Sequence, residues 1–141
     1  MLKSLELFKE KGQFEFTPID NLSDCCNAPR HSSGIYLIYA EEFKTSKLIY
    51  IGISGRESPV GEIIHRKDGL GGRIVNGKQF GLNRRRSWPM KMNEDGIKKI
   101  IVKWYVTYGE LNKDFPRNIE NTLLSKILQN NGSLPLWNKK V

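Results

Sequence analysis

Two short apolar runs joined by a brief connection constrain the fold of this chain more than any other feature. The runs cover residues 34–39 and 47–53, and both are rich in β-branched and aromatic side chains, which favour strands. The connection, residues 40–46, is short enough to join two antiparallel strands as a hairpin. Because both runs are apolar on two faces, we expect them in the middle of a sheet that helices cover, not at its rim.

Pairing the two runs symmetrically about Phe43 predicts a register for this hairpin. In that register Tyr36 lies opposite Tyr50, and Gly34 lies opposite Gly52. Residues directly opposite each other share a face of the sheet. Both phenol side chains are therefore expected on one face.

A third strand is predicted over residues 98–108, where Ile100, Val102 and Trp104 alternate with a mixed set of side chains. Prolines and polar residues punctuate residues 1–32, which we interpret as an N-terminal extension. The compact domain is then expected over residues 33–141, since a chain of 141 residues has room for one domain.

The charge balance favours a polyanionic partner. Lys and Arg number 23 against 15 Asp and Glu, a formal net charge of +8. Most of the excess lies between Arg66 and Lys91, which hold eight Lys or Arg and one acid, Asp68. This stretch belongs to a basic insert, residues 54–97, between the second and third predicted strands. No apolar run approaches the length of a membrane-spanning helix, and the N-terminal residues do not resemble a signal peptide. We therefore expect a cytoplasmic protein that binds nucleic acid and no membrane.

The two cysteines are adjacent, at positions 25 and 26. Neighbouring cysteines do not form an easy disulfide, and the chain offers only His31 and His65 as further soft ligands. Two reduced thiols are expected in place of a disulfide or a zinc site.

The last predicted helix carries the most informative residue. It is expected to begin after Asp114 and to end at Gly132. At 100° per residue, Glu120 falls inside the apolar stripe of this helix although a polar face is available. A carboxylate that faces a core is costly unless it pairs with a cation or a metal ion. Glu120 is thus a candidate metal ligand, with a structural ion pair to Arg73 as the alternative.

Two tripeptides on the predicted hairpin, Gly34-Ile35-Tyr36 and Tyr50-Ile51-Gly52, resemble the paired signature of the GIY-YIG endonuclease superfamily. The resemblance extends over residues 33–138. Its further elements are Arg73 in a Gly-rich helical segment, Glu120 on the last helix, and Asn138 in the closing Pro-Leu-Trp-Asn segment.

This resemblance implies an α+β fold, a small α/β sandwich with a three-stranded antiparallel sheet flanked by helices. It also implies that the protein hydrolyses phosphodiester bonds. Glu120 would hold one divalent ion, Mg²⁺ or Mn²⁺, which needs few protein ligands. Arg73 would contact the scissile phosphate through its bidentate fork. Tyr36 would be the general base with Tyr50 as its partner or alternate, and Asn138 would orient the site.

The chain departs from the family's pattern at two points. The interval before Arg73 is long, which leaves Arg56 or Arg66 as alternative equivalents of the arginine. Gly77 stands where many members have His or Tyr one helical turn later. His65 and Lys78 are the candidates for that function, but an ordinary surface role is the favoured interpretation for each.

The basic insert is expected to contact double-stranded DNA. Its run Arg84-Arg85-Arg86 is either a solvated loop or a set of phosphate contacts, and we favour the second. Lys78 would add a phosphate contact, and Trp88 or Asn83 would reach the bases. The long insert resembles the restriction-endonuclease branch, whose members often act as homodimers. A repair or junction-cleaving nuclease and a noncatalytic nucleic-acid-binding module are the alternatives.

Overall fold

The computed structural model describes residues 2–139 and has an α+β architecture. A four-stranded antiparallel sheet has the strand order β1-β8-β2-β3. Its strands are β1 (Lys11–Phe16), β2 (Ser33–Glu42), β3 (Thr45–Ser54) and β8 (Ile100–Tyr108).

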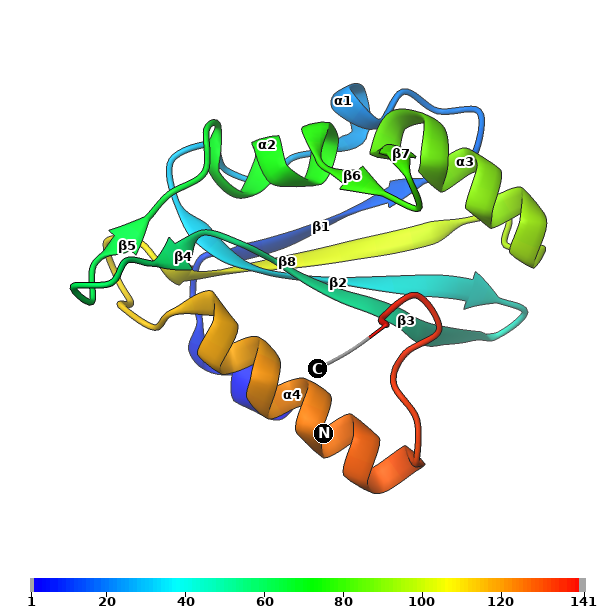
Figure 1. The fold of residues 1–141 in the computed structure, drawn as a ribbon. Helices are drawn as coiled ribbons and strands as arrows, with labels where there is room; N and C mark the ends of the chain where they lie inside the picture. Colours follow the sequence, from blue (N-terminus) through cyan, green and yellow to red (C-terminus); the bar gives the residue numbers. More distant parts are fainter. Residues whose placement is uncertain (1, 140–141) are drawn as a thin grey trace.

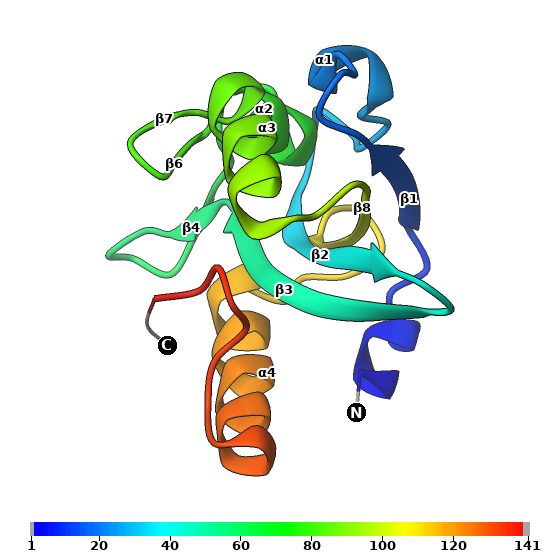
Figure 2. The ribbon, with the colours of Figure 1, turned by 90° about the vertical axis from the view of Figure 1, so that its right-hand side faces the viewer.

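Helices cover both faces of this sheet (Figures 1 and 2). One face carries α1 (Leu22–Cys25), α2 (Gly69–Asn76) and α3 (Arg84–Asp95). The other carries α4 (Pro116–Asn131) and the 3₁₀ helix η1 (Lys3–Leu7). None of the helices within residues 2–139 is long and apolar enough to cross a membrane.

The three predicted strands are present, and β1 adds a fourth. This strand comes from the segment expected as an N-terminal extension and pairs with β8. Phe14 and Phe16 are buried and alternate with exposed Gln13 and Glu15, which is the alternation of a half-buried strand. The Phe16 ring packs edge-on against the ring of Trp88 in α3, with the ring centres 6.2 Å apart. Strand β1, within the segment expected as an extension, therefore contributes to the packed core.

The expectation that both apolar runs lie inside the sheet is wrong for β3, which is an edge strand. Its open edge is covered by the C-terminal segment instead of another strand. The Trp137 amide donates to the Ile49 carbonyl at 2.7 Å. Asn138 then mimics a strand residue, because its Oδ1 accepts from the Ile51 amide at 2.9 Å and its Nδ2 donates to the Ile51 carbonyl at 3.0 Å.

The predicted hairpin register is wrong by two residues. Tyr36 lies opposite Gly52, and Gly34 lies opposite Ser54. One residue of the shift comes from the turn at Phe43 and Lys44, and the other from a bulge that leaves Ile49 unpaired. Because the total shift is even, both phenols still share one face, as predicted.

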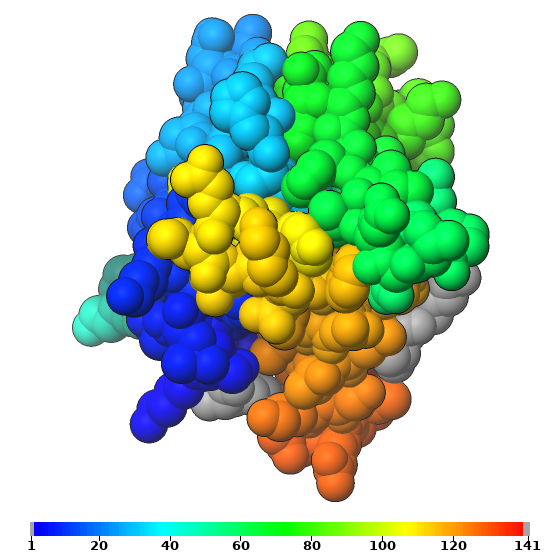
Figure 3. All heavy atoms as spheres, turned by 90° about the vertical axis from the view of Figure 1, so that its left-hand side faces the viewer, coloured from blue at the N-terminus to red at the C-terminus, as the bar shows by residue number. Residues whose placement is uncertain are grey.

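The basic insert folds into two helices and two small hairpins. Strands β4 (Arg56–Glu57) and β5 (Ile63–Ile64) form one hairpin, and β6 (Lys78–Gln79) and β7 (Leu82–Asn83) form the other. The β4–β5 hairpin projects at the end of the sheet where α4 begins (Figure 1), and the two lie beside each other in Figure 3. Helix α4 ends at Gly132, as predicted, but its N-cap is Phe115 instead of Asp114.

We expect Asn138→Ala to lower the free energy of unfolding by about 1–3 kcal/mol, because it leaves the Ile51 amide and carbonyl without partners. Urea denaturation followed by circular dichroism measures this change. Asn130→Ala, at an exposed position of α4, is the matched control and should stay within about 0.5 kcal/mol of the wild type. Equal midpoints for Asn138→Ala and the wild type would contradict the assigned edge contacts.

Candidate active site

Four of the five sequence-predicted catalytic residues line one pocket of about 450 Å³. Tyr50 reaches it from β3, Arg73 from α2, Glu120 from α4, and Asn138 from the C-terminal segment. Gln79 and Arg117 are also in its wall. We call this cavity the Glu120 pocket, since Glu120 is the one acidic side chain among the described residues that line it.

Tyr36, the fifth predicted catalytic residue, lies behind the pocket. Its side chain is fully buried, and its hydroxyl has no hydrogen-bond partner within residues 2–139. Its ring centre is 6.0 Å from that of Tyr50. Gly52 makes room for both phenols, because a Cβ at this position would lie 2.4 Å from Tyr36 Cζ and 2.7 Å from Tyr50 Cε2. Tyr50 is the phenol that reaches the pocket.

Glu120 is half-buried in the apolar stripe of α4, where its helical phase placed it. Among residues 2–139, no cation lies within 4.0 Å of its carboxylate, so the alternative of an ion pair with Arg73 is not observed. Burial raises the pKa of the Glu120 carboxyl above its usual value, and the nearby Arg117 opposes this effect only in part. The carboxylate is therefore poorly compensated by the protein alone.

Arg73 stands in the last turn of α2, where the helix dipole favours a cation. It lines the Glu120 pocket, whereas Arg56 and Arg66 do not. The geometry thus favours Arg73 over the two alternative arginines. Its Nε is buried and has no partner among the described residues.

Tyr50 is a weak acid in this setting. Burial is the main cause that raises its pKa, and the neighbouring Tyr36 and, more weakly, Glu120 raise it further. Arg84 and Arg73 oppose this rise without cancelling it. Tyr50 is therefore a neutral phenol near neutral pH.

Asn138 has a structural role beside the Glu120 pocket. Both ends of its amide bind Ile51, the residue between Tyr50 and Gly52. It therefore holds the strand segment that presents Tyr50 to the pocket.

A second, larger cavity of about 1000 Å³ adjoins the Glu120 pocket, sharing Ile53, Arg73 and Arg117 with it. We call it the cationic cleft. Its basic lining residues are Arg56, Arg66, Lys67, Arg73, Lys78 and Arg117. Within residues 2–139, none of them lies within 4.0 Å of a carboxylate. Burial is the main cause that lowers the pKa of Arg66, and the charges of Arg73, Arg84 and Arg56 lower it further, as expected where like charges crowd together.

Sequence reasoning missed Arg117 and Lys67 as members of this cleft. The sequence did contain a signal for Arg117, because residues three apart on a helix share a face and Arg117 precedes Glu120 by three positions. His65 and Lys78, the alternatives for the function missing at Gly77, both line the cleft and not the Glu120 pocket. His65 is held there by a 2.6 Å hydrogen bond between its Nδ1 and Ser33 Oγ.

Two residues expected to contact DNA lie in the core instead. Arg84 and Trp88 are fully buried, so neither reaches a phosphate or a base at the surface. The helical period explains this, because Arg84 and Trp88 share the inward face of α3, while Arg85 and Arg86 are exposed. Arg85 Nη2 donates a hydrogen bond to Asn76 Oδ1 at 3.1 Å.

Within the part of the chain that the structure describes, no three His, Cys, Asp or Glu side chains gather where they could share a metal ion. Cys25 and Cys26 are both free thiols, as predicted. Burial raises the pKa of each.

Comparisons with protein-family models, with curated proteins and with solved structures find no match.

We expect Glu120→Gln to raise the free energy of unfolding at about pH 7.5 in metal-free buffer, because it removes a carboxylate whose ionised form burial disfavours. The pKa of Glu120 in the folded protein lies above its ordinary value of 4.5. The wild type therefore loses stability as the pH rises through the interval above 4.5 and regains it as the pH falls.

Urea denaturation at about pH 7.5 and pH 4 measures this effect, and the gap between variant and wild type should nearly close at the lower value. Glu110→Gln, at an exposed position, is the control and should show little gap at either pH. A Glu120→Gln protein that is no more stable than the wild type at the higher pH would refute the assigned burial.

Proposed function

We propose that this protein is a divalent-metal-dependent DNA endonuclease of the GIY-YIG kind, which hydrolyses phosphodiester bonds. One observation carries the proposal. Glu120, a half-buried carboxylate with no cation within 4.0 Å among the described residues, shares a pocket with Arg73 and Tyr50, and this pocket adjoins the cationic cleft. Within residues 2–139, this unpaired carboxylate stands beside unpaired arginines, an arrangement that suits the binding of a metal ion and a phosphate group at neighbouring positions.

The Glu120 pocket fits a single hard cation. Mg²⁺ is commonly held by one or two carboxylates and keeps several waters, so one accessible carboxylate in a roomy pocket is a suitable ligand set. Glu120 would hold the ion, Mg²⁺ or Mn²⁺. When bound, such an ion neutralises charge on a phosphate and makes a coordinated water more acidic.

Arg73 supplies a permanent positive charge for the scissile phosphate. A guanidinium can hold two phosphate oxygens at once, and its charge survives at any accessible pH. Arg117, in the wall of both cavities, places a second cation at the same point. Negative charge that develops on the phosphoryl oxygens during hydrolysis is stabilised by cations already in position.

Tyr50 is the phenol that we assign to the attacking water. Its raised pKa means that Tyr50 Oη acts as a neutral group, which orients the water by accepting a hydrogen bond from it. Tyr36 supports the Tyr50 ring from behind, since its own hydroxyl is buried. This assignment exchanges the two roles expected from the sequence.

The proposed partner is double-stranded DNA lying along the cationic cleft, with phosphate contacts from Arg56, Arg66 and Lys67. Lys78, Arg85 and Arg86 would extend this surface from the exposed sides of β6 and α3. Because one chain has one Glu120 pocket, we propose that a homodimer cuts the two strands. The long insert favours a restriction-type enzyme over a repair or junction-cleaving one.

The experiment that tests the proposal incubates supercoiled plasmid with the protein in Mg²⁺ or Mn²⁺, beside an EDTA control. We expect nicked or linear product only with the metal, and a loss of roughly 10²-fold or more in Glu120→Ala. Glu110→Ala is the matched control and should cut like the wild type. Gel shifts in EDTA should show DNA binding by all three proteins, because the cationic cleft is intact in each.

Two results would point elsewhere. A wild-type protein that binds DNA but cuts with neither metal would favour the noncatalytic nucleic-acid-binding module, which the cationic cleft alone could serve. Full cleavage by Glu120→Ala would show that the reaction does not use the Glu120 pocket.

The phenol pair gives a separate prediction. Tyr50→Phe should slow cleavage by on the order of 10² or more, because it removes the hydroxyl that faces the pocket. Tyr36→Phe should cut within a few-fold of the wild type and be at least as stable, since it removes a buried hydroxyl that lacks a partner. Single-turnover rates on a labelled duplex measure both, and the reverse ranking would restore Tyr36 as the reacting phenol.

A further inference from the structure

Arg84 carries a buried positive charge that the proposed chemistry has not used. Its side chain is 0% exposed, although it opens α3, where the helix dipole disfavours a cation. Arginine stays charged at any accessible pH, and a buried charge normally has a counter-charge. Among residues 2–139, no carboxylate lies within 4.0 Å of Arg84. Such a residue costs stability, which favours a functional reason for its presence.

The hydrogen bonds of Arg84 lead to the wall of the Glu120 pocket. Its Nη1 donates to the main-chain carbonyl of Arg73 at 2.8 Å, and its Nε donates to Gln79 Oε1 at 3.2 Å. Arg73 and Gln79 both line the pocket. Trp88 Nε1 donates to the same Gln79 oxygen at 2.9 Å, which fixes this amide from a second side. Arg84 therefore sets the position of two pocket residues from behind.

Gly77 and Arg84 fit each other closely. A Cβ at Gly77 would lie 2.9 Å from Arg84 Nη1 and 2.6 Å from the Arg73 carbonyl oxygen. The Arg84 amide also donates to the Gly77 carbonyl at 2.9 Å. The absence of a side chain at position 77 is thus what lets the guanidinium reach the end of α2.

The charge of Arg84 also lies directly behind the phenol pair. Its guanidinium carbon is 5.3 Å from the Tyr36 ring centre and 5.5 Å from the Trp88 ring centre. Its Nη2 has no partner within residues 2–139. Screening is weak in a buried setting, so a fixed charge there acts on the neighbouring pocket more strongly than a surface charge would.

We propose that Arg84 is a positioning residue for a phosphate site: it fixes Arg73 and Gln79 in the wall of the Glu120 pocket and adds a buried positive charge that strengthens phosphate binding there. The inference rests on the proposed function for its biological meaning. Its physical content, the dependence of phosphate binding at Arg73 on Arg84, can be tested without any cleavage.

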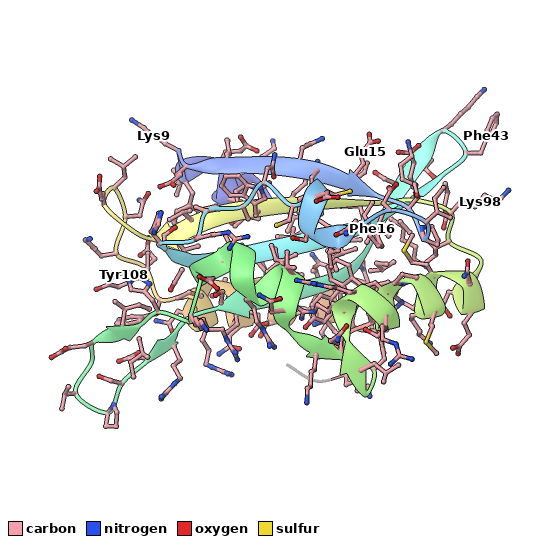
Figure 4. The ribbon with its side chains drawn as sticks, turned by 90° about the horizontal axis from the view of Figure 1, so that it is seen from above. Lys9, Glu15, Phe16, Phe43, Lys98 and Tyr108 are labelled. Atoms are coloured by element: carbon pink, nitrogen blue, oxygen red, sulfur yellow. The ribbon has the colours of Figure 1, made fainter. Side chains whose placement is uncertain are left out.

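The test titrates inorganic phosphate into the metal-free protein and follows the Nε–H resonance of Arg73 by NMR, assigned with Arg73→Lys. In the wild type we expect a saturable shift. In Arg84→Met the affinity should fall by about tenfold or more, because Arg73 loses its anchor and the buried charge is gone. Lys98→Met removes one charge from a side chain that points into solvent (Figure 4), and it should bind phosphate like the wild type.

Gly77→Ala is the second variant, for use if Arg84→Met does not fold. It keeps every charge but crowds the contact between Arg84 and Arg73, because its Cβ would meet Arg84 Nη1 and both the carbonyl oxygen and Nη1 of Arg73. It should therefore weaken phosphate binding in the same direction. Arg84→Lys keeps the charge without the two-point hydrogen bonding and should recover only part of the affinity. Unchanged affinity in a folded Arg84→Met or Gly77→Ala protein, or no phosphate binding by the wild type, would overturn the proposal.

Cleavage kinetics separate this inference from the proposed function. For an active nuclease, Arg84→Met should lower kcat by at least about tenfold with KM changed much less, because the cationic cleft still binds DNA. If the wild type cleaves DNA and Arg84→Met cleaves it at the same rate, the inference is contradicted and the proposed function is not. If phosphate binding depends on Arg84 but the protein cuts no DNA, the proposed function is contradicted and the inference is supported.

Discussion

The pairing of Tyr36 with Gly52 across β2 and β3 is the constraint on which the rest of the structure depends. The phenol of Tyr36 occupies the space that a side chain at position 52 would need. This packing brings the ring of Tyr50 alongside and turns it toward the Glu120 pocket. The register between β2 and β3 therefore determines whether both phenols lie on one face, because a slip by one residue would turn one of them to the opposite face of the sheet.

Opposite charges stand close together without neutralising each other. Glu120 faces the pocket from α4, while Arg73 and Arg84 approach from the other side of the sheet. A fold optimised for stability alone would join such groups in ion pairs or replace them with apolar side chains. Keeping Glu120 and Arg73 apart leaves both without an ion-pair partner among the described residues at the pocket, at the expense of stability.

Local pattern predicted β2, β3, β8 and the position of Glu120, but it missed β1 and did not predict how distant segments combine. The alternation of Ile100, Val102 and Trp104 identified β8, and helical phase placed Glu120 inward. The register failed because neither the turn centre nor the bulge at Ile49 has a distinct sequence signal. Arg84 was misassigned since a run of arginines suggests a solvated surface, whereas tertiary packing buried one of its three members.

The Asn138 contact with Ile51 links residues 87 positions apart. Forming a contact of such long range closes a long loop, which costs chain entropy. The residues that line the pocket beside Tyr50 therefore depend on a segment outside the strands of the sheet. How firmly Tyr50 is held is set by two hydrogen bonds of one amide side chain, so the edge of β3 is the point at which a small local change reaches the pocket.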